Sequence, residues 1–360
     1  MIPKTEAFTS KGGARIYRIP IHVFPEMWGY VHLVLSDGVV ALVDVGSGFG
    51  ESNDHLEFGL EAVRRDHGEA IEWRDLTHVL ITHGHIDHFG GLAYVRERTQ
   101  APIGIHELDR RVITGYEERL AIVAGRLSQY LKEAGVTEDE HGDLMNLYLL
   151  GKQLYASQSV DFTFEAIGMR VGPLEITHVP GHTPGQVVML IDDVLLSADH
   201  ILERISPHLA PERLSLTTGL DHYLESLEKS KALIDRTRIV LGGHERPFHD
   251  LSARIESTRS LYEDRLAQVL DLARVPMTIA EFAQELFGET AGYHRLLALE
   301  EAGAYVEYLS IRGHLGVGDI ESLERGGGSP IYYQSVDFAS QPLQSTAERD
   351  PRIGELDVRI

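Results

Sequence analysis

The feature that most constrains this 360-residue chain is the run THGHIDH at residues 82–88, which holds three imidazoles and one carboxylate. In an extended segment, His83 and His85 project to the same side. Asp87 and His88 follow the bend and can face a second centre. Imidazole and carboxylate are ligands that zinc, iron and manganese accept. The run therefore predicts a metal site at the end of a buried strand.

Three later segments supply further ligands of the same kinds. His182 lies in a turn that contains two prolines and two glycines, which leave one side chain free to project. Apolar strands are predicted to end at Asp199 and at His244, and His200 beside Asp199 is a competing candidate. The complete set of candidate ligands is His83, His85, Asp87, His88, His182, Asp199 and His244. Seven ligands suit two metal ions with one carboxylate between them.

The composition excludes several other classes of protein. The chain has no cysteine, which rules out an iron–sulfur cluster, a cysteine-ligated zinc finger and a cysteine nucleophile. Its formal net charge of −22 opposes binding to nucleic acid or to an anionic membrane. The first residues lack an apolar signal region, and no long apolar stretch suggests a membrane span. We therefore expect a cytoplasmic enzyme with no nucleic-acid or membrane partner.

The order of predicted elements indicates an α/β fold with additions. Strand and helix patterns alternate over residues 1–249, except that residues 107–158 are helical throughout and form a predicted insert. Residues 250–325 predict a small, mostly helical C-terminal domain, with helices over 251–273, 278–286 and 291–302 and a hairpin over 304–317. Residues 326–360 are predicted to form a tail. Thr278 and Glu281 match a capping box that would start the middle helix.

In order and spacing, the ligand motifs resemble the metallo-β-lactamase superfamily, and the GHTPG turn at 181–185 is similar to its glyoxalase II-like branch. The resemblance covers residues 15–247 and implies a four-layer αββα sandwich with the metals at one edge. It assigns one metal to His83, His85 and His182, the other to Asp87, His88 and His244, and the bridge to Asp199. It also gives Asp44 the role of positioning a ligand or its loop. The C-terminal unit resembles the winged-helix-like domain of some branches.

The resemblance implies a dinuclear metal-dependent hydrolase that acts on a small-molecule ester or thioester, of acyl-thioester or lactone type. A metal-bound hydroxide is the expected nucleophile, with Asp87 and Asp199 as the catalytic carboxylates. The expected cofactors are two divalent ions, with zinc favoured and iron or manganese left open. A phosphodiesterase or ribonuclease on the same site and an iron-dependent oxidoreductase are the alternatives. Homo-oligomerisation is left open.

Two expectations concern the additions to the sandwich. Apolar residues of the insert, such as Leu127, Leu131, Leu150 and Leu154, would suit an apolar or acyl-bearing substrate, or would simply pack its helices together. Residues 250–325 contain 14 acidic and 7 basic side chains. A net charge of −7 argues against a helix that enters a nucleic-acid groove, so packing or oligomerisation is the expected role of this domain.

Overall fold

The computed structural model describes residues 3–318, 320 and 329–336. The strands are β1 (Glu6–Thr9), β2 (Arg15–Phe24), β3 (Met27–Ser36), β4 (Val39–Val43), β5 (His78–Leu80), β6 (Ile103–Ile105), β7 (Phe162–Thr163), β8 (Arg170–Val171), β9 (Leu174–His178), β10 (Val187–Ile191), β11 (Val194–Ala198), β12 (Ile239–Gly242), β13 (Leu315–Val317) and β14 (Tyr333–Ser335). The α-helices are α1 (Ser52–His67), α2 (Ile86–Phe89), α3 (Leu92–Arg96), α4 (Glu107–Thr114), α5 (Tyr116–Glu133), α6 (Glu138–Lys152), α7 (Leu220–Ser230), α8 (Leu251–Leu272), α9 (Ile279–Phe287) and α10 (Gly292–Ile311). Short 3₁₀ helices span Trp73–Asp75, Glu165–Ile167 and Lys231–Arg236.

Two mixed sheets form the centre of the molecule. The larger sheet has the order β1-β2-β3-β4-β5-β6-β7, antiparallel up to β4 and parallel from β4 onward. The smaller sheet has the order β12-β11-β10-β9-β8, in which only β11 and β12 are parallel. Because β4 and β5 are parallel, and β11 and β12 are parallel, the carboxyl ends of each pair meet at one edge of its sheet.

The buried side chains of these strands divide into layers with a period of two. In β10, Val187, Met189 and Ile191 face the core between the sheets, whereas Val188 and Leu190 face the helices outside the smaller sheet. On the outer face of the larger sheet, Leu56, Leu60 and Val63 of α1 pack at helical spacing. The fold is therefore the predicted αββα sandwich.

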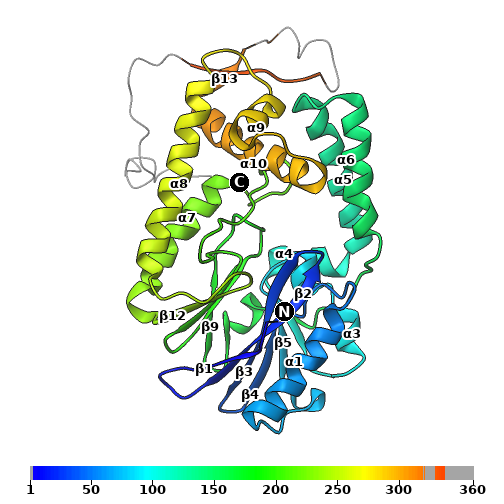
Figure 1. The fold of residues 1–360 in the computed structure, drawn as a ribbon, viewed down its shortest axis with the longest axis vertical. Helices are drawn as coiled ribbons and strands as arrows, with labels where there is room; N and C mark the ends of the chain where they lie inside the picture. The colour runs from blue at the N-terminus through cyan, green and yellow to red at the C-terminus, as the bar shows by residue number, and fades with distance from the viewer. Residues whose placement is uncertain (1–2, 319, 321–328, 337–360) are drawn as a thin grey trace, which may run out of the picture.

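The predicted insert and the C-terminal helices share one core with the smaller sheet. Leu131 of α5 and Leu144 of α6 belong to the same buried cluster as Ile255 of α8, Phe282 of α9 and Leu299 of α10. In Figure 1, α5 and α6 rise along one side of the sandwich, α7 and α8 along the other, and α9 and α10 lie across the top. Much of the apolar surface of the insert therefore packs against other helices. The capping box at the start of α9 is confirmed.

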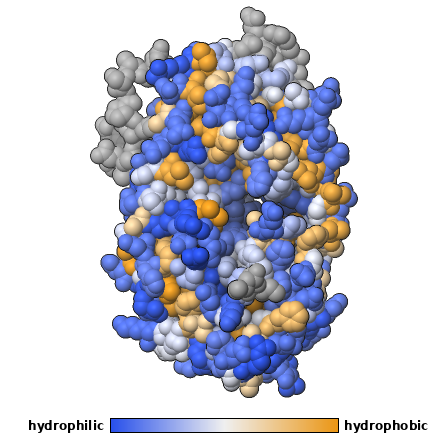
Figure 2. Space-filling model, in the orientation of Figure 1, coloured by the Kyte–Doolittle hydropathy of each residue, from blue (hydrophilic) through white to orange (hydrophobic). Residues whose placement is uncertain are grey.

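The outer face of the insert retains exposed apolar side chains. Leu150 is 73% exposed and Leu154 is 67% exposed, and Figure 2 shows hydrophobic groups along the edge formed by α5 and α6. The two leucines point to solvent, so they give no support to an apolar substrate. Within the described residues, no helix is long and apolar enough to cross a bilayer.

The hairpin predicted over residues 304–317 is wrong. Helix α10 continues to Ile311, because Ala304, Tyr305, Tyr308 and Leu309 recur at helical spacing and are buried in the shared core. The strand that follows, β13, pairs antiparallel with β14 rather than with a neighbour in the predicted hairpin. Of the predicted tail, residues 326–328 and 337–360 lie outside the described residues. The domain boundaries stay a prediction.

Candidate metal centre

The seven candidate ligands lie on the loop and short helix α2 that follow β5, on the β9–β10 turn, and directly after β11 and β12. They form two groups, and within each the potential ligand atoms lie within 4.8 Å of one another. We name these groups the three-histidine cluster, which is His83, His85 and His182, and the four-residue cluster, which is Asp87, His88, Asp199 and His244. The first combines the loop after β5 with the β9–β10 turn, and the second combines α2 with the residues that follow β11 and β12.

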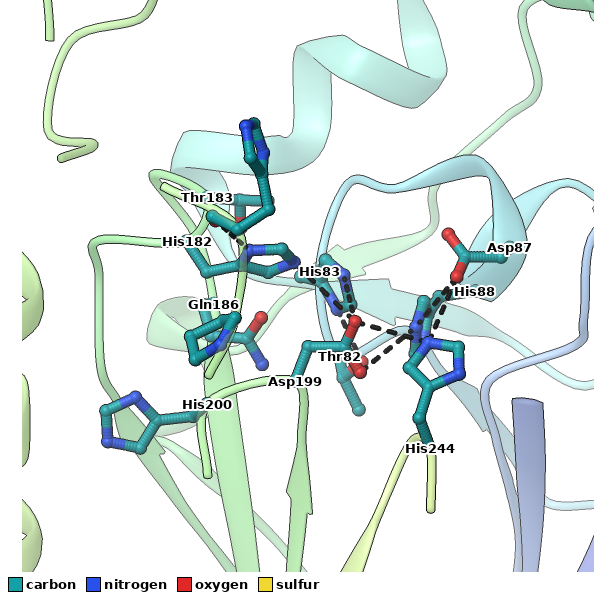
Figure 3. Close-up of polar contacts among 12 residues, drawn as sticks. Thr82, His83, Asp87, His88, His182, Thr183, Gln186, Asp199, His200 and His244 are labelled. Carbon is teal, nitrogen blue, oxygen red and sulfur yellow. Dashed lines mark hydrogen bonds and ion pairs between the residues drawn. The ribbon is translucent and has the colours of Figure 1, made fainter. Parts of the chain in front are cut away.

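The carboxylate of Asp199 lies between the three-histidine cluster and the other three members of its own cluster (Figure 3). Its Oδ2 is 3.6 Å from His182 Nε2 on one side and 3.4 Å from His244 Nε2 on the other. Its Oδ1 is 3.4 Å from His88 Nε2. One carboxylate therefore faces histidines of both clusters, which is the position that a ligand shared by two cations needs.

Four of the histidines are oriented by a bond at Nδ1. His83 Nδ1 lies 3.0 Å from Thr82 Oγ1, and His88 Nδ1 lies 2.8 Å from Asp44 Oδ2. Backbone carbonyls do the same for the other two: the His208 oxygen is 2.7 Å from His182 Nδ1, and the Trp28 oxygen is 2.8 Å from His244 Nδ1. With Nδ1 engaged, Nε2 of each ring is left to face the clusters.

Asp44 contacts the segment that carries the ligands His83 and His88. Its Oδ1 accepts a hydrogen bond from the Thr82 backbone N–H, and its Oδ2 accepts one from the Thr82 hydroxyl, both at 2.8 Å. Asp44 has φ of 63°, in the left-handed region, and Ala198 beside Asp199 and Glu245 beside His244 have φ of 45° and 58°. Such conformations cost energy and are typical of functional sites.

His200, the competitor of Asp199, belongs to neither cluster. Its side chain points away from Asp199 in Figure 3, and its Nε2 lies 2.9 Å from the Ser230 hydroxyl in the interior. Since Ala198 has a positive φ at the strand end, the turn directs Asp199 toward the histidines and His200 toward α7.

The unpaired nitrogen and oxygen atoms of the two clusters fit a pair of divalent cations. Nε2 of His83, His88 and His182 and Oδ1 of Asp199 are buried and have no hydrogen-bond partner among the described residues. Four buried orphan atoms in one place would be costly in a site built only for packing. Nitrogen and carboxylate oxygen donors in this number are what zinc, iron or manganese would take. The two clusters are therefore consistent with a dinuclear metal site.

The ionisable groups influence one another strongly. Burial lowers the pKa of His83 and of His85 well below the usual value. Burial also disfavours the charged form of His88, but the nearby carboxylates, led by Asp199, raise its pKa well above the usual value. For Asp199, burial opposes ionisation, yet His244 and His88 hold the pKa well below its usual range. Asp199 and His88 thus each favour the charged form of the other.

Two residues at the site carried no recognisable signal in the sequence. Asp109 of α4 is fully buried and contacts the loops that bear His83, His85 and His182. A Cβ atom added to Gly243 would lie 2.4 Å from Asp199 Oδ1. Asp109 lies outside every ligand motif, and although Gly243 directly precedes His244, only the folded structure shows how close it lies to Asp199.

These features agree with the comparisons with known proteins. The model of the metallo-β-lactamase superfamily matches residues 29–244, and the chain belongs to that superfamily. Together with the two His/Asp clusters, the family identifies a metal-dependent hydrolase.

Several individual proteins are similar to this chain. An uncharacterised protein of Mycobacterium leprae is 32% identical over 174 residues, which are 46% of this chain and 67% of the relative. The probable metallo-hydrolase YflN of Bacillus subtilis is 26% identical over 126 residues, or 34% of this chain and 44% of the relative. A metallo-β-lactamase family protein from Thermus thermophilus shares the fold with a TM-score of 0.68 at 24% identity, covering 89% of this chain and 98% of the other. A β-lactamase domain protein from Burkholderia ambifaria gives 0.70 at 23% identity, covering 92% and 94%.

Proposed function

We propose that this protein hydrolyses an ester or thioester, of acyl-thioester or lactone type, at a dinuclear metal site. The observation that carries the proposal is the position of the Asp199 carboxylate, which faces histidines of both clusters at 3.4–3.6 Å. A glyoxalase II-like hydrolase is the branch we favour, because the motif order and the GHTPG turn at 181–185 suit it.

Each cluster has a distinct role in this proposal. The three-histidine cluster would hold one cation, Asp87, His88 and His244 the other, and Asp199 would serve both. Divalent cations supply Lewis-acid polarisation and acidify water at neutral pH. The chain itself orients four of the imidazoles through their Nδ1 bonds, and Asp87, whose side chain is 15% exposed against 10% for Asp199, is the more exposed of the two carboxylates. We propose zinc as the metal, since it accepts histidine and carboxylate ligands.

Charge favours an ester or thioester over a polyanionic substrate. The net charge of −22 would repel a nucleic acid from the surface as a whole. For the same reason, we propose that the C-terminal helices, α8 to α10, serve packing rather than nucleic-acid binding, and their burial against α5 and α6 supports this role. A winged-helix-like domain and a cytoplasmic location stay part of the proposal.

The test combines metal analysis with a substrate panel. Purified protein is analysed for zinc, iron and manganese, and is then assayed with matched thioester, lactone and phosphodiester substrates. We expect two metal ions per chain and turnover of a thioester or lactone. Turnover that is restricted to phosphodiesters would replace the proposed reaction, and protein that is fully active after its metals have been chelated would refute the metal-dependent mechanism.

A further inference from the structure

Asp109 lies where the helical insert begins and contacts both loops of the three-histidine cluster. It is on the first turn of α4 and is 0% exposed. Its Oδ2 accepts hydrogen bonds from the Gly84 N–H at 2.8 Å and from the Thr183 hydroxyl at 2.7 Å. Its Oδ1 accepts a third from the Gly185 N–H at 2.9 Å.

The partners of this carboxylate are interleaved with the candidate ligands. Gly84 lies between His83 and His85 in the chain, and Thr183 directly follows His182. One buried side chain therefore joins two loops that are about a hundred residues apart in the sequence and that together supply the complete three-histidine cluster. The four-residue cluster receives no hydrogen bond from Asp109 among the described residues.

Both loops can approach the Asp109 carboxylate closely because each has a glycine at the point of contact. A Cβ atom added to Gly185 would lie 2.7 Å from Asp109 Cγ, and one added to Gly84 would lie 3.2 Å from it. Side chains at these positions would push the carboxylate away from the backbone N–H groups that it accepts from. The two glycines and the threonine thus form a fitted cradle around the carboxylate.

We propose that Asp109 is a positioning residue that holds the three-histidine cluster in a geometry able to bind a cation. This inference rests on the proposed function, because it assumes a metal at that cluster. A carboxylate is suited to the task, since it is an acceptor at both oxygens and can bind N–H donors of two loops at once. Because α4 leads directly into α5, the same contact also joins the insert to the metal site.

The test measures metal affinity rather than activity. Wild-type protein and Asp109→Asn are titrated with Zn²⁺ in competition with a chromophoric chelator. The amide keeps the size of the side chain. Its NH₂ group cannot accept a hydrogen bond, so at least one of the three donors that now bind the carboxylate would lose its acceptor. We expect wild type to bind two ions, and the variant to lose about 10- to 100-fold in affinity at one site while the other site is unchanged.

A milder variant keeps the inference falsifiable if Asp109→Asn does not fold. Thr183→Val removes only the bond from the Thr183 hydroxyl, and we expect the same selective loss at smaller size. Thr258→Val is the matched control, because Thr258 is 1% exposed on α8 and its hydroxyl bonds to the Arg254 carbonyl. Its Zn²⁺ affinities should equal those of wild type.

The outcomes separate this inference from the proposed function. If wild type binds two Zn²⁺ ions and both Asp109→Asn and Thr183→Val bind two with unchanged affinity, the role of Asp109 is overturned and the dinuclear site stands. An equal loss at both sites would also overturn it, because the effect would then not be specific to the three-histidine cluster. Wild type that binds no Zn²⁺ would overturn the dinuclear site and this inference together.

Discussion

Gly243 is the position at which the smallest substitution should do the most damage to the site. A Cβ atom there would lie 2.4 Å from Asp199 Oδ1 and 2.8 Å from His88 Cε1. The backbone has little freedom to retreat, because the Gly243 N–H donates to the Ala198 carbonyl at 2.9 Å and its own carbonyl accepts from the Tyr30 N–H at 2.8 Å. The Asp199 carboxylate itself must therefore move in Gly243→Ala.

The size of the effect follows from these distances. Real Cβ contacts are essentially never shorter than 3.0 Å, so Asp199 Oδ1 has to shift by at least 0.6 Å. Misplacing a reacting group by about 1 Å can cost about 100-fold in rate. We therefore expect Gly243→Ala to lower kcat/KM by about 10- to 100-fold and to weaken metal binding by a similar factor.

The control is a glycine at which the added methyl group meets nothing. Gly125 lies within α5, and a Cβ atom there has no neighbour within 4 Å. Gly125→Ala should leave hydrolysis and metal content unchanged and raise the free energy of unfolding by about 0.5–1 kcal/mol. The assays are steady-state hydrolysis of the substrate found in the panel, elemental analysis and urea unfolding. Wild-type kcat/KM and two tightly bound ions in Gly243→Ala would refute the steric reasoning.

Three further predictions concern a ligand, the core and pH. His182→Ala should abolish turnover and cost one metal ion while the protein stays folded by circular dichroism; appreciable turnover would argue against its role. Phe282→Ala empties a fully buried position in the shared core, so urea unfolding should show a loss of about 3–5 kcal/mol; a loss below about 1 kcal/mol would contradict that packing. Burial raises the pKa of Glu301 from 4.5 to about 7, although the Tyr305 hydroxyl bond at 2.6 Å opposes the shift. The unfolded chain therefore releases this proton first as pH rises from 4.5 to 7, and the stability that Glu301 contributes, about 3 kcal/mol, is lost over that interval. Glu301→Gln should remove this dependence in urea unfolding at pH 5 and pH 8, and an identical pH dependence in both proteins would contradict the shift.

The resemblance to the superfamily implied the sandwich, and the candidate ligands could be found in the sequence because such side chains leave a local signature. The candidate ligands fall at the end of an apolar strand, just past the bend that follows it, or in a turn rich in proline and glycine, and those patterns are readable within about ten residues. Order and spacing also favoured Asp199 over His200, and in the structure Asp199 belongs to the four-residue cluster whereas His200 belongs to neither cluster. The position of a ligand at a strand end was enough to predict that it lies near the others, since parallel neighbouring strands bring their carboxyl ends together.

The C-terminal region shows where local patterns fail. The segment from Ala304 to Ile311 contains tyrosine, valine and isoleucine, which favour strands when they are considered alone. In the structure the same residues continue α10, because its buried face packs against α8 and the insert. Packing between helices that are distant in the sequence makes this segment helical, and the residues of the segment alone contain no information about that packing.

The groups that orient the ligands were hidden from the sequence for a different reason. His182 and His244 are held by the backbone carbonyls of His208 and Trp28, and every residue type offers the same carbonyl. Whether a carbonyl oxygen can bind the Nδ1 atom of a ligand depends only on where the oxygen lies, and the whole fold sets that position. Asp109 lies outside every ligand motif, although its partners, two glycine N–H groups and a threonine hydroxyl, lie within the motifs at 82–88 and 181–185. Asp109 also belongs to α4, so the insert contributes a side chain that holds the loops of the three-histidine cluster. Removing the insert should therefore cost the three-histidine cluster its geometry, even though the insert supplies none of its ligands.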